Sequence, residues 1–213
     1  MSDYLLPVVS GFSGAFFAYV FVRITDFAKA IIIRKHDHLR SLRNLHLLFV
    51  DLGNGIHFNV EQIQDYLGDL KRQEGKEEPI YSIYRPYPLD VRNYSIDGLK
   101  NLDLLNDVIH YKYKATELNS ILNSFCKIND LYRDKSIGNP DFHREYIEHT
   151  LSNKEIANFL LALHLDLQEH NRCIFERISK VASRDDFFLN RYFKSLVKSC
   201  YPDGLIPCFS SKK

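Results

Sequence analysis

Apolar residues fill the first part of the chain without interruption by a charge. Residues 4–22 are 19 uncharged positions, and a helix of that length covers about 28 Å, close to the thickness of the hydrocarbon core of a bilayer. Asp3 precedes this run, whereas Arg23 and Lys29 come after it. A secretory signal peptide has the opposite order, with its positive charges before the apolar run. The pattern therefore predicts a transmembrane helix that is not cleaved.

The charges on either side of this run also predict its orientation. Lys and Arg are enriched on the cytoplasmic side of membrane helices. We therefore expect a single pass through the inner (plasma) membrane, with the N-terminus outside and most of the chain in the cytoplasm. The alternative is a core helix of a soluble protein, but such a helix usually has a polar face, and residues 4–22 have none.

Small residues occupy one face of the predicted membrane helix. They recur with a spacing of three and four positions at Gly11, Gly14, Ala15 and Ala18. Small residues at this spacing let two membrane helices approach closely, so the stripe predicts a homo-oligomer. Around the axis of such an oligomer, Arg23 and Asp26 are candidates for lining a pore; the alternative is a solvated face beside the membrane.

The helical pattern continues beyond the apolar run. Neither Gly nor Pro occurs from Arg23 to Leu52, and the first strong stop signal is Gly53-Asn54-Gly55. We therefore predict one continuous helix that begins in the membrane anchor, residues 1–23, and extends through a lever, residues 24–55. The remaining residues, 56–213, form the predicted cytosolic helical domain.

Two long amphipathic stretches dominate this domain. Apolar positions recur every three and four residues over 96–132 and again over 142–181, and Gly138 and Pro140 lie between the two stretches. We expect two long helices that form an antiparallel hairpin. No segment shows the alternation of a strand. The predicted fold class is all-α, with the transmembrane helix continuous with a long cytosolic helix and followed by a helical bundle built around this hairpin.

Capping boxes and turn residues predict the remaining boundaries. Residues 59–62 and 152–155 have the capping-box pattern, so we expect helices to begin at both places. A last helix is predicted over 186–199. Residues 73–95 contain Pro79, Pro86 and Pro88 and show no helical period, which predicts a long loop.

Tyrosines in this loop are candidates for contacts with a partner. Tyr81, Tyr84 and Tyr87 lie within seven residues of one another, beside Arg85. Such side chains can bind a cytosolic protein or stack on a base of RNA. The alternative is that the three rings pin the loop against the helical core. The sequence leaves both interpretations open.

Composition narrows the chemistry. The chain has 28 basic and 27 acidic residues, a net charge of +1, which argues against a protein that binds mainly nucleic acid through electrostatics. Cys126, Cys173, Cys200 and Cys208 lack the spacing of a zinc knuckle, so we expect free thiols. His36 and His38 point about 200° apart on a helix and cannot share an ion. We predict no metal and no cofactor.

One motif carries a possible chemistry. Arg144 and His149 form an Arg-x4-His pattern within a predicted helix. The pattern resembles the signature of HEPN ribonucleases, which are all-helical. The resemblance implies that Arg144 and His149 of two protomers meet and cleave RNA, because Arg stabilises a phosphorane and His transfers a proton near neutral pH. A structural role for both residues is the alternative.

The layout of the chain also resembles a known group. A short N-terminal anchor followed by an all-helical domain with Arg-x4-His is similar to the membrane accessory proteins of type VI-B CRISPR systems and, more loosely, to other single-pass antiphage effectors. This resemblance implies a role in bacterial antiviral defence and a membrane pore.

The sequence supports three hypotheses for function. The preferred one is a non-enzymatic, membrane-anchored oligomer that acts as an accessory or effector protein and perturbs or permeabilises the membrane. The second is a membrane-tethered ribonuclease that uses Arg144 and His149. The third is a membrane scaffold that recruits a cytosolic partner through the tyrosine-rich loop.

Overall fold

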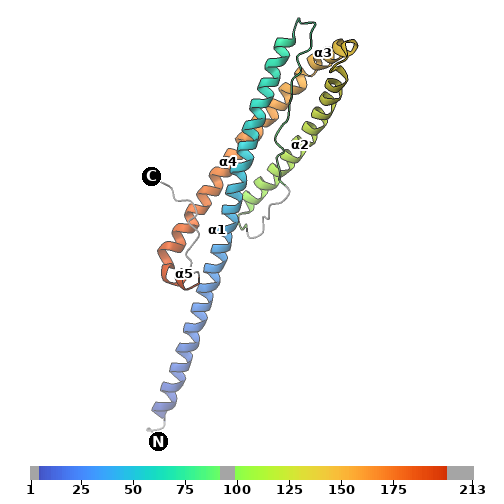
Figure 1. The fold of residues 1–213 in the computed structure, drawn as a ribbon. Coiled ribbons are helices and arrows are strands. Elements are labelled where there is room, and N and C mark those ends of the chain that lie inside the picture. Colours follow the sequence, from blue (N-terminus) through green and yellow to red (C-terminus); the bar gives the residue numbers. More distant parts are fainter. Residues whose placement is uncertain (1–4, 92–98, 201–213) are drawn as a thin grey trace. The chain divides into compact units, whose positions relative to one another are not determined.

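The computed structural model describes residues 5–91 and 99–200, apart from the side chains of 5–10 and 197–199. Six helical elements succeed one another along the chain (Figure 1), namely α1 (Leu5–Gln73), α2 (Leu102–Ser136), the 3-10 helix η1 (Pro140–Phe142), α3 (His143–Ser152), α4 (Lys154–Tyr192) and α5 (Lys194–Cys200). No strand occurs in the described ranges. The predicted all-α fold class is confirmed.

The described residues pack as two compact units. One unit comprises the residues up to Arg43 together with those from Lys180 onward, and the other comprises Asn44–Ser179. We refer to them as the terminal unit and the central unit. The helices α1 and α4 each contribute residues to both units.

A buried ion pair joins α1 and α4 in the terminal unit. Lys35 Nζ lies 2.7 Å from Asp185 Oδ1, and the Asp185 side chain is only 4% exposed. His38 Nε2 lies 3.7 Å from the other carboxylate oxygen. Apolar side chains buried in the same unit are Ile32, Leu39, Leu42, Ala182 and Leu189. A buried carboxylate is stable only when it is paired, so Lys35 is what allows Asp185 to lie in this core.

Three long helices, α1, α2 and α4, form most of the central unit. The ring of Phe49 lies 5.0 Å from that of Tyr111, and the ring of Tyr66 lies 5.7 Å from that of Phe125, so α1 and α2 run parallel. Lys114 pairs with Asp166 at 2.7 Å, and Asp107 pairs with Arg177, so α2 and α4 run antiparallel. The predicted antiparallel hairpin is therefore confirmed. The largest buried aliphatic side chains of this core include Leu45, Leu52, Ile56, Ile63, Leu104 and Leu122.

The predicted stop at Gly53-Asn54-Gly55 is wrong, because α1 continues through it to Gln73. A Cβ atom on Gly55 would lie 2.6 Å from Cδ1 of Tyr87, and one on Gly53 would lie 3.4 Å from Oδ1 of Asn171. Both glycines therefore let other segments approach the backbone of α1 closely. Their cost in a helix, about 0.5–1 kcal/mol each, is small beside the hydrogen bonds of a helix this long.

The helix start predicted at residues 59–62 is also wrong. Asn59 lies in the interior of α1, is fully buried, and binds the backbone of Tyr87 instead of capping a helix. Likewise, no separate helix begins at 186, because α4 continues to Tyr192 and only Phe193 separates it from α5. No Gly or Pro occurs over 154–200 to end α4 earlier.

Two predicted breaks are confirmed. Between α2 and α3, Gly138 has a φ of 74°, a conformation that glycine adopts without strain. Between α3 and α4, the chain turns at Asn153, whose N–H donates to Thr150 O at 3.2 Å and whose carbonyl accepts from Ala157 N at 2.9 Å. The capping box at 152–155 therefore marks a real junction.

Candidate functional site

The first candidate is the part of α1 that precedes the terminal unit's core, residues 11–27, which we call the apolar segment. Eight large side chains are 55–76% exposed here: Phe12, Phe16, Phe17, Tyr19, Phe21, Val22, Ile24 and Phe27. Phe12, Phe17 and Val22 follow one another at intervals of five residues, so each lies about 140° around the helix from the one before it, and together they reach all sides of the helix. A helix that is apolar all round is stable when protein or lipid surrounds it.

The described part of the chain does not support the predicted transmembrane helix. Within the described residues, none of the helices combines the length and the apolar character that crossing a bilayer requires. The predicted span begins at Tyr4, which lies outside the described residues, as do the side chains of 5–10. The transmembrane helix therefore stays a prediction.

The small-residue stripe is open in this chain. Among the described residues, no atom of another segment lies within 4 Å of a Cβ built on Gly11 or Gly14, and Ala15 and Ala18 are exposed. The stripe is therefore accessible to a helix of another copy, and the contact itself stays a prediction.

The two pore-lining candidates differ in their surroundings. Arg23 folds back along the helix, where its Nε donates to the Tyr19 hydroxyl at 3.1 Å and its guanidinium lies 5.3 Å from the centre of the Tyr19 ring. Asp26 is exposed. Arg23 and Asp26 do not pair with each other, and their role in a pore stays a prediction.

The structure does not bring Arg144 and His149 together. Both lie on α3, five residues apart and hence about 140° apart around the helix. The Arg144 side chain is 90% exposed and pairs with Glu148 at 2.9 Å. His149 faces α2, where its ring stacks on that of Tyr132 with the centroids 3.8 Å apart. Within one chain, the two side chains do not face a common cleft.

His149 belongs to a polar cluster that ties α2 to the α3–α4 junction. Its Nε2 lies 3.2 Å from Asn129 Oδ1 and 3.1 Å from Asn153 Nδ2, and Asn153 Nδ2 donates to Asn129 Oδ1 at 2.7 Å. Burial lowers the pKa of His149, although Glu145 raises it in part. Nε2 therefore lies within hydrogen-bond distance of two amides, and the tautomer of the ring decides whether it donates to Asn129 Oδ1 or accepts from Asn153 Nδ2. This geometry suits a structural role.

The second candidate is the chain segment 79–91, which we call the strap. It runs alongside α1 and α2 (Figure 1), and amide side chains bind its backbone. Asn59 accepts from Tyr87 N and donates to Tyr87 O at 3.0 Å, whereas Asn119 accepts from Leu89 N and donates to Leu89 O at 2.7 Å. Each amide thus pairs with both backbone groups of one residue, as a neighbouring strand would.

The anchor points require the strap to be extended. Gln73 accepts from Ile80 N, and Asn59 accepts from Tyr87 N. These two amides are about 21 Å apart along α1, at about 1.5 Å per residue. The seven residue-to-residue steps from Ile80 to Tyr87 span at most about 25 Å when the chain is fully extended. The strap is therefore close to its full length between the two anchors, which leaves little room for a turn.

The three predicted contact tyrosines have different positions on the strap. Tyr84 is buried against Tyr66 and Phe125, with ring centroids 6.1 and 5.9 Å away, so its proposed role as a contact residue is corrected to that of a core residue. Tyr81 is 37% exposed, and its hydroxyl lies 3.1 Å from Ser136 O. Tyr87 is 44% exposed and covers Gly55.

Sequence reasoning missed one exposed residue of the strap, Ile83, although it placed Arg85 beside the tyrosines. Ile83 is 64% exposed, and Arg85 is exposed and forms no ion pair within the described residues. In an extended chain alternate side chains point to opposite sides, so Tyr81, Ile83, Arg85 and Tyr87 share the outer side while Tyr84 points inward. The signal in the sequence was that residues 81, 83, 85 and 87 are alternate positions. Because the segment was predicted to be an irregular loop, the alternation expected of an extended chain was not considered.

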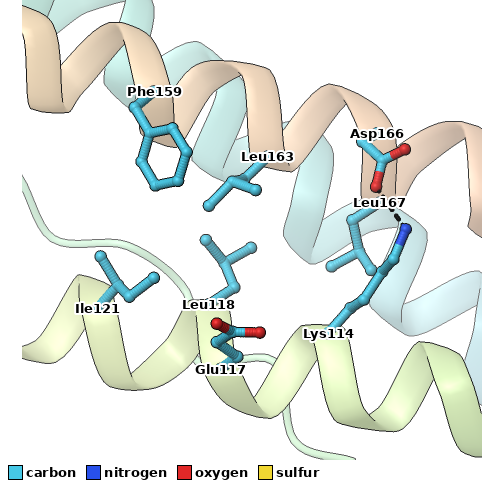
Figure 2. A pocket seen from close by; sticks show the side chains of 8 residues that line it. All are labelled: Lys114, Glu117, Leu118, Ile121, Phe159, Leu163, Asp166 and Leu167. Carbon is cyan, nitrogen blue, oxygen red and sulfur yellow. Dashed lines mark hydrogen bonds and ion pairs between the residues drawn. The ribbon is translucent and has the colours of Figure 1, made fainter.

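A third candidate is a pocket between α2 and α4 in the central unit (Figure 2), with a volume of about 180 Å³. Leu118 and Ile121 of α2 face Phe159, Leu163 and Leu167 of α4 across it. The Lys114–Asp166 ion pair closes one end (Figure 2). Sequence reasoning missed this pocket because Leu118, Ile121 and Leu163 fit the apolar stripe that packs a hairpin together.

The cysteines and acidic residues do not form a metal site in the described part of the chain, where no three His, Cys, Asp or Glu side chains converge in a way that can hold an ion. Cys126, Cys173 and Cys200 are free thiols, whereas Cys208 lies outside the described residues. No protein-family model, curated protein or solved structure matches the chain. The resemblances to HEPN ribonucleases and to CRISPR accessory proteins thus have no support from these comparisons.

Proposed function

We propose that the protein is a membrane-anchored, non-enzymatic protein that acts as a homo-oligomer. The apolar segment inserts into lipid, and the central unit lies in the cytoplasm. The observation that carries this proposal is the exposure of eight large apolar side chains on all sides of α1 between residues 11 and 27.

The energetics favour an apolar environment for this segment. Burial of one large apolar side chain contributes about 1.5–3 kcal/mol, so eight of them contribute of the order of 10 kcal/mol. This gain is unused in the isolated chain in water. Arg23 and Lys29 come directly after the most apolar part of α1, and basic residues on this side favour a cytoplasmic location for the rest of the chain.

The proposed assembly uses the small-residue stripe. In lipid, helices associate through close packing, and Gly11, Gly14, Ala15 and Ala18 leave the α1 backbone accessible to a second copy. We propose that the assembled protein acts on the membrane itself, as an accessory or effector that perturbs or permeabilises it.

The anchor is tested by fractionation of cells that express the full chain. We expect the protein in the membrane pellet after carbonate washing, and we expect Phe12→Asp with Phe17→Asp to move it to the supernatant, because an Asp at the centre of a membrane helix costs about 2.5–3.5 kcal/mol. Phe58→Asp is the matched control, since Phe58 is an exposed phenylalanine of α1 outside the apolar segment. Wild-type protein in the supernatant would contradict the proposal.

A second candidate function is recruitment of a cytosolic partner. It is favoured by the outer side of the strap, where Ile83, Arg85 and Tyr87 are exposed on a backbone that Asn59 and Asn119 hold in place. A rigid extended segment with an apolar and a basic side chain costs little conformational entropy when a partner binds it.

A further inference from the structure

The pocket between α2 and α4 has the size of one aromatic side chain. Its volume is about 180 Å³, and a cavity of about 150 Å³ lined by Leu, Ile and Phe holds a benzene ring. The five apolar side chains Leu118, Ile121, Phe159, Leu163 and Leu167 surround it from two helices (Figure 2). A phenylalanine or leucine from outside can therefore fill it without rearrangement of the bundle.

Exposed apolar side chains continue the line of the pocket along both helices, and we call the pocket together with this strip the α2/α4 groove. On α2, Ile121 and Ile128 are seven residues apart and share a helical face. On α4, Ile156, Phe159 and Leu163 are spaced by three and four residues. Ile128, Ile156 and Phe159 are 49%, 44% and 54% exposed. From Lys114 to Ile128 the groove extends about 21 Å, which matches about four turns of a helix.

The charge at the rim of the pocket indicates the sign of the charge that a ligand should carry there. Glu117 is exposed at the mouth of the pocket and forms no ion pair within the described ranges. Asp166 is matched by Lys114, at 2.7 Å. One negative charge is thus left without a partner beside an apolar pocket. An occupant with a basic residue next to a large apolar one complements both features.

We propose that the α2/α4 groove is the docking site for a basic amphipathic helix of a partner protein, which inserts one large apolar side chain into the pocket and places a Lys or Arg against Glu117. An amphipathic helix in an apolar groove is a common mode of recognition, with anchors at i, i+3, i+4 and i+7. All the residues involved belong to the central unit, so this inference does not depend on the membrane anchor.

The test uses a designed peptide and the full-length protein in nanodiscs of zwitterionic lipid. The peptide is an 18-residue helix with a central Phe, Leu residues one turn to either side and Lys residues along the flanks. We expect binding by fluorescence anisotropy, at micromolar concentration and above the background of empty nanodiscs. Two matched peptides, with Phe→Ser or with every Lys→Glu, should bind at least tenfold more weakly. Equal binding of the three peptides would overturn the proposal.

Variants of the protein locate the binding. Glu117→Lys should weaken binding at least tenfold, and Leu163→Trp should abolish it by filling the pocket. Asp65→Lys, a charge reversal at an exposed position of α1 outside the groove, should have no effect, and circular dichroism should show all three variants folded. Unchanged binding by Glu117→Lys and Leu163→Trp would refute the site. A second result would also refute the site: the wild type is oligomeric and does not bind the peptide, whereas these two variants are monomeric. The groove would then be an interface between copies.

Discussion

Gly55 shows at the scale of one residue how α1 and the strap depend on each other. The ring of Tyr87 occupies the space where any other residue would have its Cβ, 2.6 Å from that position. Asn59, one turn further along α1, holds the Tyr87 backbone in place, so the ring cannot easily move away. We therefore expect Gly55→Ala to lower the free energy of unfolding by about 1–3 kcal/mol, the usual cost of overpacking a core.

Gly68 is the matched control for this prediction. It also lies within α1, but in the described part of the chain no atom of another segment lies within 4 Å of a Cβ built there. Gly68→Ala should raise the free energy of unfolding by about 0.5–1 kcal/mol, because Ala loses less backbone entropy in a helix. Urea denaturation of both variants, monitored by circular dichroism, measures the difference. Equal effects of the two substitutions would contradict the close contact at Gly55.

His164 makes the fold sensitive to acid. It is fully buried, and its Nδ1 donates to Leu160 O at 2.7 Å, which leaves Nε2 buried without a hydrogen-bond partner. Burial lowers its pKa below the usual 6.5. The unfolded chain therefore takes up a proton at higher pH than the folded one. This contribution to stability is present above about pH 6.5 and is lost as the pH falls from there toward the folded pKa.

Thermal unfolding between pH 7.5 and 5 tests this sign. The Tm of the wild type should fall as the pH is lowered. The Tm of His164→Leu, which lacks the buried titratable group, should fall less steeply. His57→Leu is the control, because that side chain is 65% exposed. Burial also lowers the pKa values of His46 and His170, so His164→Leu should reduce the pH dependence and not remove it. An unchanged slope in His164→Leu would refute the role of His164.

At the scale of the element, helical periodicity predicted most of the fold. The spacing of three and four apolar residues identified α2 and α4, and Gly138 and the capping box at 152–155 correctly marked the end of α2 and the start of α4. The other two ends differ from the prediction, because α2 begins at Leu102 and α4 continues to Tyr192. The same rules failed in α1, because Gly53, Gly55 and Asn59 have their roles in contacts with Asn171 and Tyr87. Those partners are distant in sequence, so local signals could not distinguish a close packing site from a helix stop.

The strap shows the same limit for the candidate site. Its tyrosines were recognised, but only the extended backbone decides that Tyr84 is buried while Ile83 and Arg85 are exposed. That conformation depends on Gln73, Asn59 and Asn119. The pocket at Ile121 and Leu163 likewise exists only because two apolar stripes meet without filling the space between them.

The small-residue stripe carries the prediction for assembly. Gly14→Leu combined with Ala18→Leu places two large side chains on the face that we propose packs against another copy, so close approach is lost. We expect mass photometry of the protein in detergent to show a shift from oligomer to monomer, with reduced release of dye from liposomes. Phe16→Leu with Phe21→Leu is the control, since these residues lie elsewhere on the helix and stay apolar. An unchanged oligomer in the stripe variant would contradict this interface.

At the scale of the whole molecule, the proposed function separates two tasks along the chain. The apolar segment, residues 11–27, has its large side chains exposed, and no described part of the chain covers them. The central unit, Asn44–Ser179, has a core of its own and presents the strap and the α2/α4 groove to possible partners. Attachment and recognition are therefore expected to be separable by substitution.

The absence of tryptophan from the chain allows a direct test of lipid contact. Phe17→Trp places a single fluorophore in the apolar segment, and Phe58→Trp places one on the central unit. In liposomes with brominated acyl chains, we predict blue-shifted emission and strong quenching for Phe17→Trp and neither effect for Phe58→Trp. Emission from Phe17→Trp that is unquenched by brominated lipid would contradict the membrane anchor.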